Sequence, residues 1–300
     1  MSIQVPTQTL ALLTKGTISL DDVEQHLSAN GIKCHLEDAV RPSGEMKSFA
    51  RSTLSDDGPM VLIESCAFPW SELAGSDALA ANGDFLQESL ERACQFQLSW
   101  EGVEGAIAEH QAIVLVSIVE EAGKTLSPVS QLRRLVELSK TVLAIGHHPE
   151  VIAYFCPAGE VLLPVAMLAE LLQTSQIAEV PPLDLFSNLR LSWLDERWVI
   201  FETIGNSQLL LPDFEIYADS QQHDLNELAS WLRRLSWRQL TPENALADSH
   251  AIQNPQGADF DVVYAEDALL SPSRNVVRLI ARDELAMPNG LPKRLRIERK

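Results

Sequence analysis

The pattern of hydrophobic and polar positions predicts both strands and helices, and it is clearest in the middle third of the chain. The apolar segment Ala112–Val119 is rich in branched side chains that suit a pleated sheet, and it is too short to span a membrane. After an N-cap at Ser127 and a proline at the next position, Val129–Leu143 places its apolar residues on one helical face. Val151–Phe155 then returns as an apolar strand. We expect the two strands to be neighbours in one sheet, with the helix packed across it.

The N-terminal third predicts further strands and helices. Ser19 and the acidic residues behind it form an N-cap signal, and Gly31 ends that helix. The alternating stretch Gln95–Trp100 leaves a strand open as an alternative to a helix end, and the polar stretch Arg41–Gly58 is compatible with disorder. The expected strands are Thr9–Thr14, Ile32–Leu36 and Met60–Phe68, and the expected helices are Ser19–Ala29, Phe85–Cys94 and Val103–Ala108.

The C-terminal half reads as hairpins mixed with single helices. Pro164 opens a helix, and Pro181-Pro182 marks the best internal boundary because two prolines block both helix and central strand. The division predicted there is into α+β units 1–176 and 177–300, with a single domain as the alternative. The remaining expected strands are Leu189–Leu194, Trp198–Ile204, Phe214–Tyr217, Asp259–Tyr264 and Val276–Ile280, with a helix opened by Asp224.

This irregular alternation of strands and helices predicts the fold class. It favours an α+β protein with mixed or antiparallel sheets and helices packed on one face, over a doubly wound parallel sheet. Two successive β-α-β segments are compatible with ferredoxin-like halves.

Composition and charge bound the compartment and the partners. With 46% hydrophobic residues and no apolar run long enough to cross a bilayer, we expect a cytoplasmic globular protein that does not enter the membrane. The net charge of −19 argues against nucleic acid as a partner and favours a basic protein. Residues 270–300 hold eight basic and three acidic residues, which predicts a positive tail that lies against the acidic body or is solvated.

The four cysteines give no metal or redox motif. They lie at positions 34, 66, 94 and 156 without a Cys-x-x-Cys pair, so buried reduced thiols are expected and neither a disulfide nor a zinc ribbon is. Phosphate loops, dinucleotide fingerprints and nucleophile elbows are also missing from the sequence. We therefore assign no catalytic residue, no metal ligand and no cofactor.

One stretch matches a family pattern. Between Phe201 and Tyr217 the chain reads FETIGNSQLLLPDFEIY, in which a Thr-x-Gly element precedes a Leu-Pro-x-x-Glu element. The matching residues are Thr203, Gly205, Leu211, Pro212 and Glu215. Together with the apolar segments before it, this stretch resembles the bacterial domain of unknown function "forty-two sixty-one" over roughly residues 9 to 218.

The resemblance has two departures within the stretch. Leu210 stands where the family has glycine, and Asp213 stands where it has glutamate. The resemblance implies a fold and a bacterial origin, and it implies no activity.

Carboxylates and histidines are the candidate site residues. Asp213 and Glu215 are two positions apart and therefore share one face of a strand, where Glu202 could join them in a metal site. The interpretation we favour is a solvent-exposed face, in which neutral replacements would leave the melting temperature unchanged or slightly higher. His147 and His148 follow a helix end and are expected to cap it.

Three classes of function fit these patterns. The one we favour is a noncatalytic protein-binding or adaptor protein with a basic partner, of which toxin neutralisation would be one form. The second is a metal-dependent or small-molecule enzyme with a site around Glu202, Asp213 and Glu215. The third is an acidic mimic of nucleic acid. The candidate binding residues common to these hypotheses are Glu202, Thr203, Gly205, Pro212, Asp213, Glu215, His147 and His148.

Overall fold

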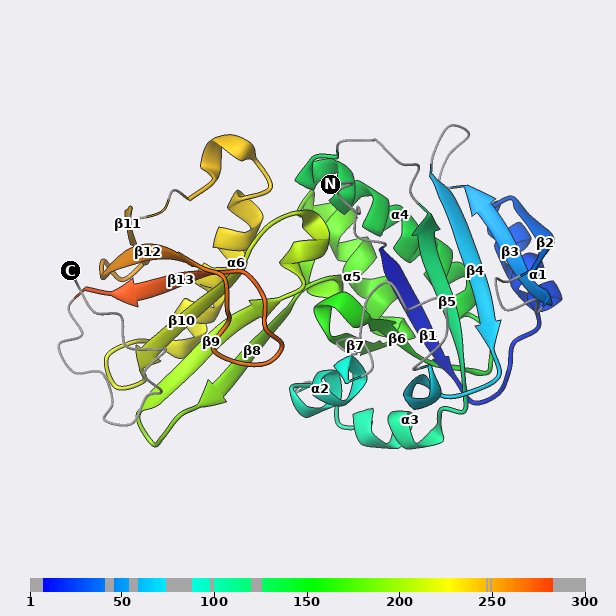
Figure 1. The fold of residues 1–300 in the computed structure, drawn as a ribbon, viewed down its shortest axis with the longest axis horizontal. Coiled ribbons are helices and arrows are strands. Elements are labelled where there is room, and N and C mark those ends of the chain that lie inside the picture. Colours follow the sequence, from blue (N-terminus) through cyan, green and yellow to red (C-terminus); the bar gives the residue numbers. More distant parts are fainter. Residues whose placement is uncertain are drawn as a thin grey trace. The chain divides into compact units, whose positions relative to one another are not determined.

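The fold consists of two compact units, each built on a sheet of its own (Figure 1). The computed structural model describes residues 8–40, 46–53, 59–73, 88–97, 100–119, 126–246, 248 and 250–282. The units are Met1–Phe186 and Ser187–Lys300. One sheet is antiparallel and the other is mixed, and helices pack against both, so the protein is α+β as predicted.

The first unit contains a seven-stranded antiparallel sheet with the strand order β2-β3-β4-β5-β1-β6-β7. Its strands are β1 (Thr9–Thr14), β2 (Cys34–Val40), β3 (Met46–Thr53), β4 (Met60–Cys66), β5 (Ala112–Val119), β6 (Val151–Cys156) and β7 (Val161–Pro164). The prediction that β5 and β6 lie in one sheet is confirmed. The prediction that they are neighbours is wrong, because β1 lies between them.

The insertion of β1 has a physical reason. Each of its six residues is buried, so the strand needs cover on both faces and a hydrogen-bonded partner on both sides. Both β5 and β6 run antiparallel to β1, and they are therefore parallel to each other, as in a split β-α-β unit. The short connection between β5 and β6 does not reveal this, because the intervening strand comes from the start of the chain.

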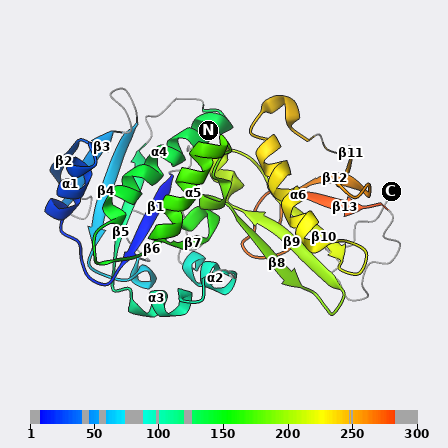
Figure 2. The same ribbon diagram turned by 180° about the vertical axis from the view of Figure 1, so that it is seen from behind.

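Helices cover both faces of this sheet. The longer ones, α1 (Leu20–Ala29), α4 (Pro128–Gly146) and α5 (Val165–Ala178), share one face; α4 and α5 lie behind the strands in Figure 1 and in front of them in Figure 2. As predicted, α4 packs across β1, β5 and β6. The short helices α2 (Ser89–Gln95) and α3 (Val103–Glu109) pack on the other face. On this face the ring of Trp70 meets that of Phe155 edge-on, with 4.8 Å between the ring centroids.

Local signals account for the helix ends in this unit. The Ser127 hydroxyl accepts a hydrogen bond from the Ser130 amide at 3.2 Å, and the Ser19 hydroxyl accepts one from the Asp22 amide at 3.1 Å. Gly146 is the last residue of α4, and a Cβ there would lie 2.8 Å from the Val165 Cγ1 atom. The glycine is therefore needed for the close approach of α4 and α5.

Two strands of the first unit are absent from the predicted elements. β7 precedes the helix that Pro164 opens, and β3 lies within Arg41–Gly58, which was expected to be compatible with disorder. Residues 41–45 and 54–58 are outside the described residues. β3 pairs with strands on both sides and buries Ala50 completely, so sheet pairing rather than its own polar pattern makes it a strand.

The boundary between the two units falls after Phe186. The sequence predicted units 1–176 and 177–300, with the boundary in the segment that contains Pro181-Pro182. Tyr154 on β6 donates its hydroxyl proton to the Leu185 carbonyl oxygen at 2.8 Å, and Phe186 is fully buried. The prolines do follow the end of α5, but the chain after them still packs on the first sheet.

The second unit is a six-stranded mixed sheet with the strand order β11-β12-β13-β10-β9-β8. Its strands are β8 (Asn188–Trp193), β9 (Trp198–Ile204), β10 (Asp213–Asp219), β11 (Ala251–Gln253), β12 (Asp259–Ala265) and β13 (Val276–Ala281). Only the β10–β13 pairing is parallel among the pairings described. The helix α6 (Leu225–Arg238) begins after Asp224, whose side chain accepts hydrogen bonds from two amides, as its sequence predicts.

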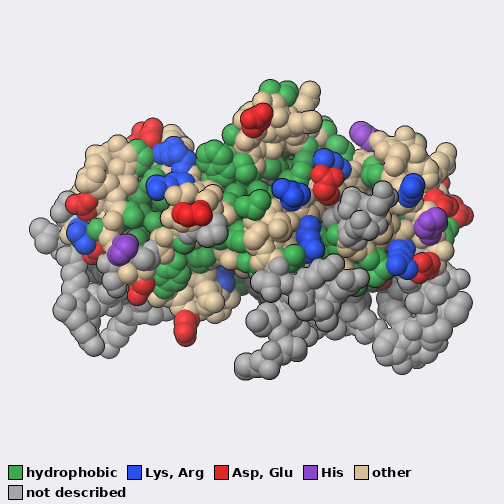
Figure 3. Space-filling model, turned by 90° about the horizontal axis from the view of Figure 1, so that it is seen from above, with side chains coloured by type: hydrophobic (Ala, Val, Ile, Leu, Met, Phe, Trp, Pro, Cys, Tyr) green, Lys and Arg blue, Asp and Glu red, His purple; other side chains and the backbone are tan. Residues whose placement is uncertain are grey.

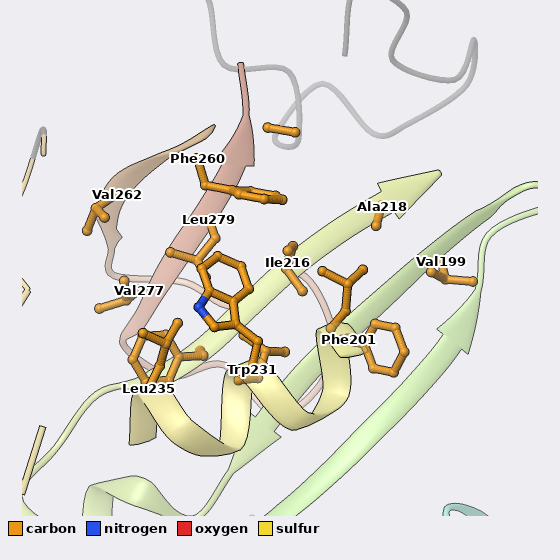
Figure 4. Close-up of a cluster of buried hydrophobic side chains, with 14 residues drawn as sticks. Val199, Phe201, Ile216, Ala218, Trp231, Leu235, Phe260, Val262, Val277 and Leu279 are labelled. Atoms are coloured by element: carbon orange, nitrogen blue, oxygen red, sulfur yellow. The ribbon is translucent and has the colours of Figure 1, made fainter. Parts of the chain in front are cut away.

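One face of this sheet packs against α6. Trp231 and Leu235 point from the helix toward Ile216, Phe260 and the other labelled side chains of the strands (Figure 4). The Trp231 and Phe260 rings are 5.0 Å apart between centroids. Because β10 alternates, Phe214 and Ile216 belong to this apolar face, and the residues between them point to the opposite face.

Candidate functional site

Three carboxylates converge on the face of the second sheet that is opposite α6. Glu202 on β9 lies directly across from Glu215 on β10, and Asp213 is two positions before Glu215 on the same face. Their exposed fractions are 0% for Glu202 and Glu215 and 1% for Asp213. The prediction of a solvent-exposed carboxylate face is therefore wrong, because this face of the sheet is covered.

Three arginines neutralise the carboxylates. Arg274 donates from Nε to Asp213 Oδ2 at 3.1 Å and from Nη2 to Glu202 Oε2 at 2.6 Å. Arg190 on β8 donates to the other Glu202 oxygen at 2.5 Å, and Arg278 on β13 donates to Glu215 Oε2 at 2.9 Å. Three guanidinium groups thus balance three carboxylates, which is how buried charges are accommodated.

The same network holds the segment between β12 and β13, residues 266–275, over this face. The Arg190 guanidinium donates to the Ser271 carbonyl at 2.9 Å, and Arg278 donates to the Asp267 carbonyl at 3.0 Å. The Leu269 amide donates to Glu215 Oε1, and the Leu269 side chain packs in a small apolar cluster on the same face. The covering segment is therefore attached through side chains of the sheet.

Asp213 also organises the turn that contains the Thr-x-Gly element. Its carboxylate accepts hydrogen bonds from the Thr203 hydroxyl at 3.1 Å, the Gly205 amide at 3.3 Å and the Asn206 amide at 3.0 Å. The Asn206 side chain donates to the Pro212 carbonyl at 3.2 Å, which closes the turn. Thr203, Gly205 and Pro212 of the matched pattern thus belong to one hydrogen-bonded loop.

Two positions of this loop, Gly205 and Leu210, have a left-handed backbone, a conformation that favours glycine. Gly205 has φ +114°, in a region that favours glycine. Leu210 has φ +59°, so the backbone is left-handed at the position where the resembled family has glycine. The chain keeps that conformation with a leucine whose exposed fraction is 43%.

Burial shifts the titration of two carboxylates. It raises the pKa of Asp213 above the ordinary value, although Arg274 and the three donors of the turn act in the opposite direction. Burial likewise raises the pKa of Glu215, against the lowering effect of Arg278 and of the Leu269 amide. The arginines therefore offset only part of the desolvation of these two groups.

The arrangement leaves little capacity for a metal ion. Each of the three carboxylates accepts from an arginine, and the remaining oxygens of Asp213 and Glu215 accept from backbone amides or a hydroxyl. Across the described parts of the chain, no group of three or more His, Cys, Asp or Glu side chains could hold a metal ion. The carboxylates of this cluster are thus paired with arginines of the same unit.

The two adjacent histidines belong to the first unit and have separate surroundings. His147 is the C-cap residue of α4 and lines a hollow of about 330 Å³ with Lys140 and Thr53. His148 Nδ1 lies 3.2 Å from the amide nitrogen of Glu150, and its ring centroid is 5.2 Å from that of His26. His147 thus occupies the C-cap position of α4, where its backbone amide donates to the Ile145 carbonyl, and capping by the two histidine side chains stays a prediction.

Sequence reasoning missed all three arginines of the network. Arg274 and Arg278 were counted in a positive tail, but they are 11% and 7% exposed at the side chain and pair inside the unit. The signal was present in β13, because Arg278 interrupts the apolar run VVRLIA at a position where a lone charge needs a buried partner. The five bases beyond Arg282 lie outside the described residues.

Comparison with known proteins identifies no relative. The chain matches no protein-family model, no curated protein and no solved structure. The resemblance of residues 9 to 218 to a bacterial family of unknown function therefore stays a prediction. Within the described ranges, no helix is long and apolar enough to cross a bilayer.

Proposed function

We propose that this chain is a noncatalytic cytoplasmic protein of bacterial origin that binds a basic protein partner, as an adaptor or a toxin-neutralising protein does. The proposal rests on which residues carry the excess of negative charge. Five buried carboxylates pair with five arginines, so these groups cancel one another. The carboxylates are Glu160, Glu202, Asp213, Glu215 and Asp219, and the arginines are Arg92, Arg190, Arg197, Arg274 and Arg278.

The whole excess of −19 therefore remains for the rest of the chain. Negative potential of this size attracts positively charged partners over a distance, raises their association rate and disfavours acidic competitors. A basic protein is the partner that this charge fits. Because salt screens such attraction, the affinity should fall as ionic strength rises.

Two alternatives receive less support. An enzyme built on Glu202, Asp213 and Glu215 would need carboxylate oxygens free for substrate or metal, and those oxygens accept hydrogen bonds from arginines, a hydroxyl and amides. A nucleic-acid mimic would need a continuous acidic track. On the face seen in Figure 3, acidic and basic side chains of the described residues are interspersed with hydrophobic ones.

The test is capture and reconstitution of the partner. The full chain is immobilised, exposed to a bacterial lysate at low salt, and the retained proteins are identified by mass spectrometry and purified. We expect a partner with an excess of Lys and Arg that forms a stoichiometric complex in gel filtration and dissociates as salt is raised. The same capture is repeated with DNA present. If DNA prevents retention of the partner, the partner is a nucleic-acid-binding protein, as the mimic alternative requires.

Two results would count against the proposal. One is that no protein forms a stoichiometric complex with the chain at low salt. The other is a purified partner that is acidic, or whose affinity does not change with salt, because the charge argument would then have no part in recognition.

A further inference from the structure

The free edge of the second sheet is formed by β8, which pairs with β9 on one side only among the described strands. An edge strand presents unpaired amide and carbonyl groups that can template another strand. The register shows which groups these are. The Leu194 amide donates to the Trp198 carbonyl at 2.8 Å, so position 194, and with it the even positions of β8, faces β9.

The odd positions of β8 therefore direct their amides and carbonyls to the open side. These residues are Leu189, Leu191 and Trp193. Their side chains lie on the α6 face of the sheet: Leu189 and Leu191 are partly buried against the apolar cluster beneath α6, and Trp193 is 56% exposed. The edge thus combines three free backbone positions with an apolar stripe.

The other sheet edges are protected in ways that β8 is not. β7 has four residues and ends at Pro164, and β11 has only three. β2 is longer, but it carries the exposed Glu37. Short edges, prolines and charges are the devices that prevent edge pairing.

β8 itself contains no acidic residue, in a chain with 42 of them. The charge it does carry, on Arg190, points to the buried face and is balanced by Glu202. Two copies of an acidic protein repel each other over most of their surface, and an edge without carboxylates is where that repulsion is least.

We propose that β8 pairs with β8 of a second copy of this chain, in antiparallel orientation about a twofold axis through Leu191. In this register Leu191 lies opposite Leu191 of the partner, and Leu189 lies opposite the partner's Trp193. The outward amides and carbonyls of all three positions are then paired, giving about six hydrogen bonds between the copies. The two apolar stripes become one continuous surface on the α6 side of a twelve-stranded sheet.

The dimer is expected to be weak. A six-residue strand pair with one apolar stripe buries less than the roughly 800 Å² per partner of a standard interface. The monomer–dimer equilibrium should therefore depend on protein concentration. The inference is independent of the basic partner proposed above, and it gives that partner a twofold-symmetric target.

Sedimentation velocity of the full chain over a concentration series tests the proposal. We expect a shift toward the dimer with concentration in wild type, and monomer at all concentrations in Trp193→Lys. Trp237→Lys is the matched control, because it makes the same change at an aromatic residue that is 41% exposed on α6. This control should dimerise like wild type.

A variant that removes a backbone amide distinguishes strand pairing from nonspecific association through exposed apolar side chains. Leu191→Pro removes an amide that points away from β9, so it should spare the β8–β9 ladder and abolish the dimer. Circular dichroism checks that the variant is folded. If Leu191→Pro unfolds the protein, Trp193→Lys alone decides the question.

Cross-linking tests the register. In Leu191→Cys, the two introduced thiols lie across the twofold axis on backbones about 5.5 Å apart, so a short bis-maleimide should link two chains. Trp237→Cys is the control for accessible cysteines and should give no more cross-linked dimer than wild type. A monomeric wild type at the highest soluble concentration, a dimer that persists in Trp193→Lys, or equal cross-linking at both positions would overturn the proposal.

Discussion

The environments of Asp213 and Glu215 in the fold differ from the environment that their sequence pattern predicts. In the sequence they look like a solvated pair, yet in the fold each has an arginine partner and nearly no exposure. Removing a charge from such a pair leaves the partner buried and uncompensated. The neutral double replacement that the sequence predicted to be harmless becomes a destabilising change.

We therefore expect Asp213→Asn with Glu215→Gln to lower the free energy of unfolding by about 1–3 kcal/mol, measured by urea denaturation, because each amide places an NH2 group among buried donors that then lack an acceptor. Asp261→Asn is the control, because its ion pair with Arg282 is partly exposed and should be worth at most about 1 kcal/mol. Calorimetry should show no rise in melting temperature with Mg²⁺, Mn²⁺ or Zn²⁺. An unchanged urea midpoint in the double variant, or a metal-dependent rise in wild type, would contradict the internal role of these carboxylates.

Leu210 tests backbone strain at a single position. Its left-handed conformation costs a non-glycine residue roughly 1–2 kcal/mol, whereas glycine adopts it freely but loses about 0.5–1 kcal/mol of chain entropy on folding. Because the side chain is largely exposed, Leu210→Gly should stabilise the protein by up to about 1 kcal/mol in thermal denaturation. Leu210→Val, which places a β-branched residue in the same conformation, should destabilise it, and the opposite order of the two variants would refute the strain.

At the scale of elements, α4 is attached to the first sheet by its apolar stripe. Leu135 lies at the centre of that stripe and is fully buried. Leu135→Ala should lower the free energy of unfolding by about 2–5 kcal/mol, because it removes buried atoms and leaves a cavity. Val129→Ala on the same helix is the control, since Val129 is 45% exposed and its loss should be within about 0.5 kcal/mol. Equal midpoints for the two variants would mean that the helix does not depend on this contact.

The β8–β9 hairpin is joined to the end of β10 by an ion pair that should respond to pH. Arg197 donates from Nε to Asp219 Oδ2 at 2.6 Å, and this hydrogen bond is the main cause that lowers the pKa of Asp219 below 3.8. A carboxyl with a lowered folded pKa stabilises the protein above its unfolded pKa, and the stabilisation is lost as the pH falls through the folded pKa.

Wild type should therefore be more stable than Asp219→Asn at about pH 7, and the difference should shrink as the pH falls below 3.8. Urea denaturation at a series of pH values measures it. A difference that stays constant down to the acid transition would show that the stabilisation does not come from the ionised carboxyl. Asp261→Asn again serves as the control, since its pairing is partly exposed.

At the scale of the whole molecule, each unit has its own sheet and its own buried cluster. We expect residues 1–186 and 187–300, expressed separately, to fold and to unfold cooperatively. A piece that ends at residue 176 should be clearly less stable than 1–186, because it lacks the Leu185 carbonyl that Tyr154 binds and the buried Phe186. Thermal denaturation followed by circular dichroism compares them, and equal melting temperatures would place the boundary at the prolines instead.

The sequence alone determined most of the local structure. The branched run of β5, the strand β1, and the N-caps Ser19, Ser127 and Asp224 predicted elements that the structure contains with nearly the same bounds. These signals are readable because each depends on neighbours within one or two turns: a side-chain oxygen reaches its own helix amide, and an apolar period marks one face. The α+β class followed from the order of such elements.

Only the tertiary structure decided which strands are adjacent and what covers the carboxylates. β1 lies between β5 and β6, and Arg274 reaches Glu202 and Asp213 from more than sixty positions away. An alternating strand has the same pattern whether its polar face meets water or a layer of arginines, because periodicity reports the two faces and not what lies over them. That choice is made by contacts between distant parts of the chain, where buried charges must find partners to offset their desolvation.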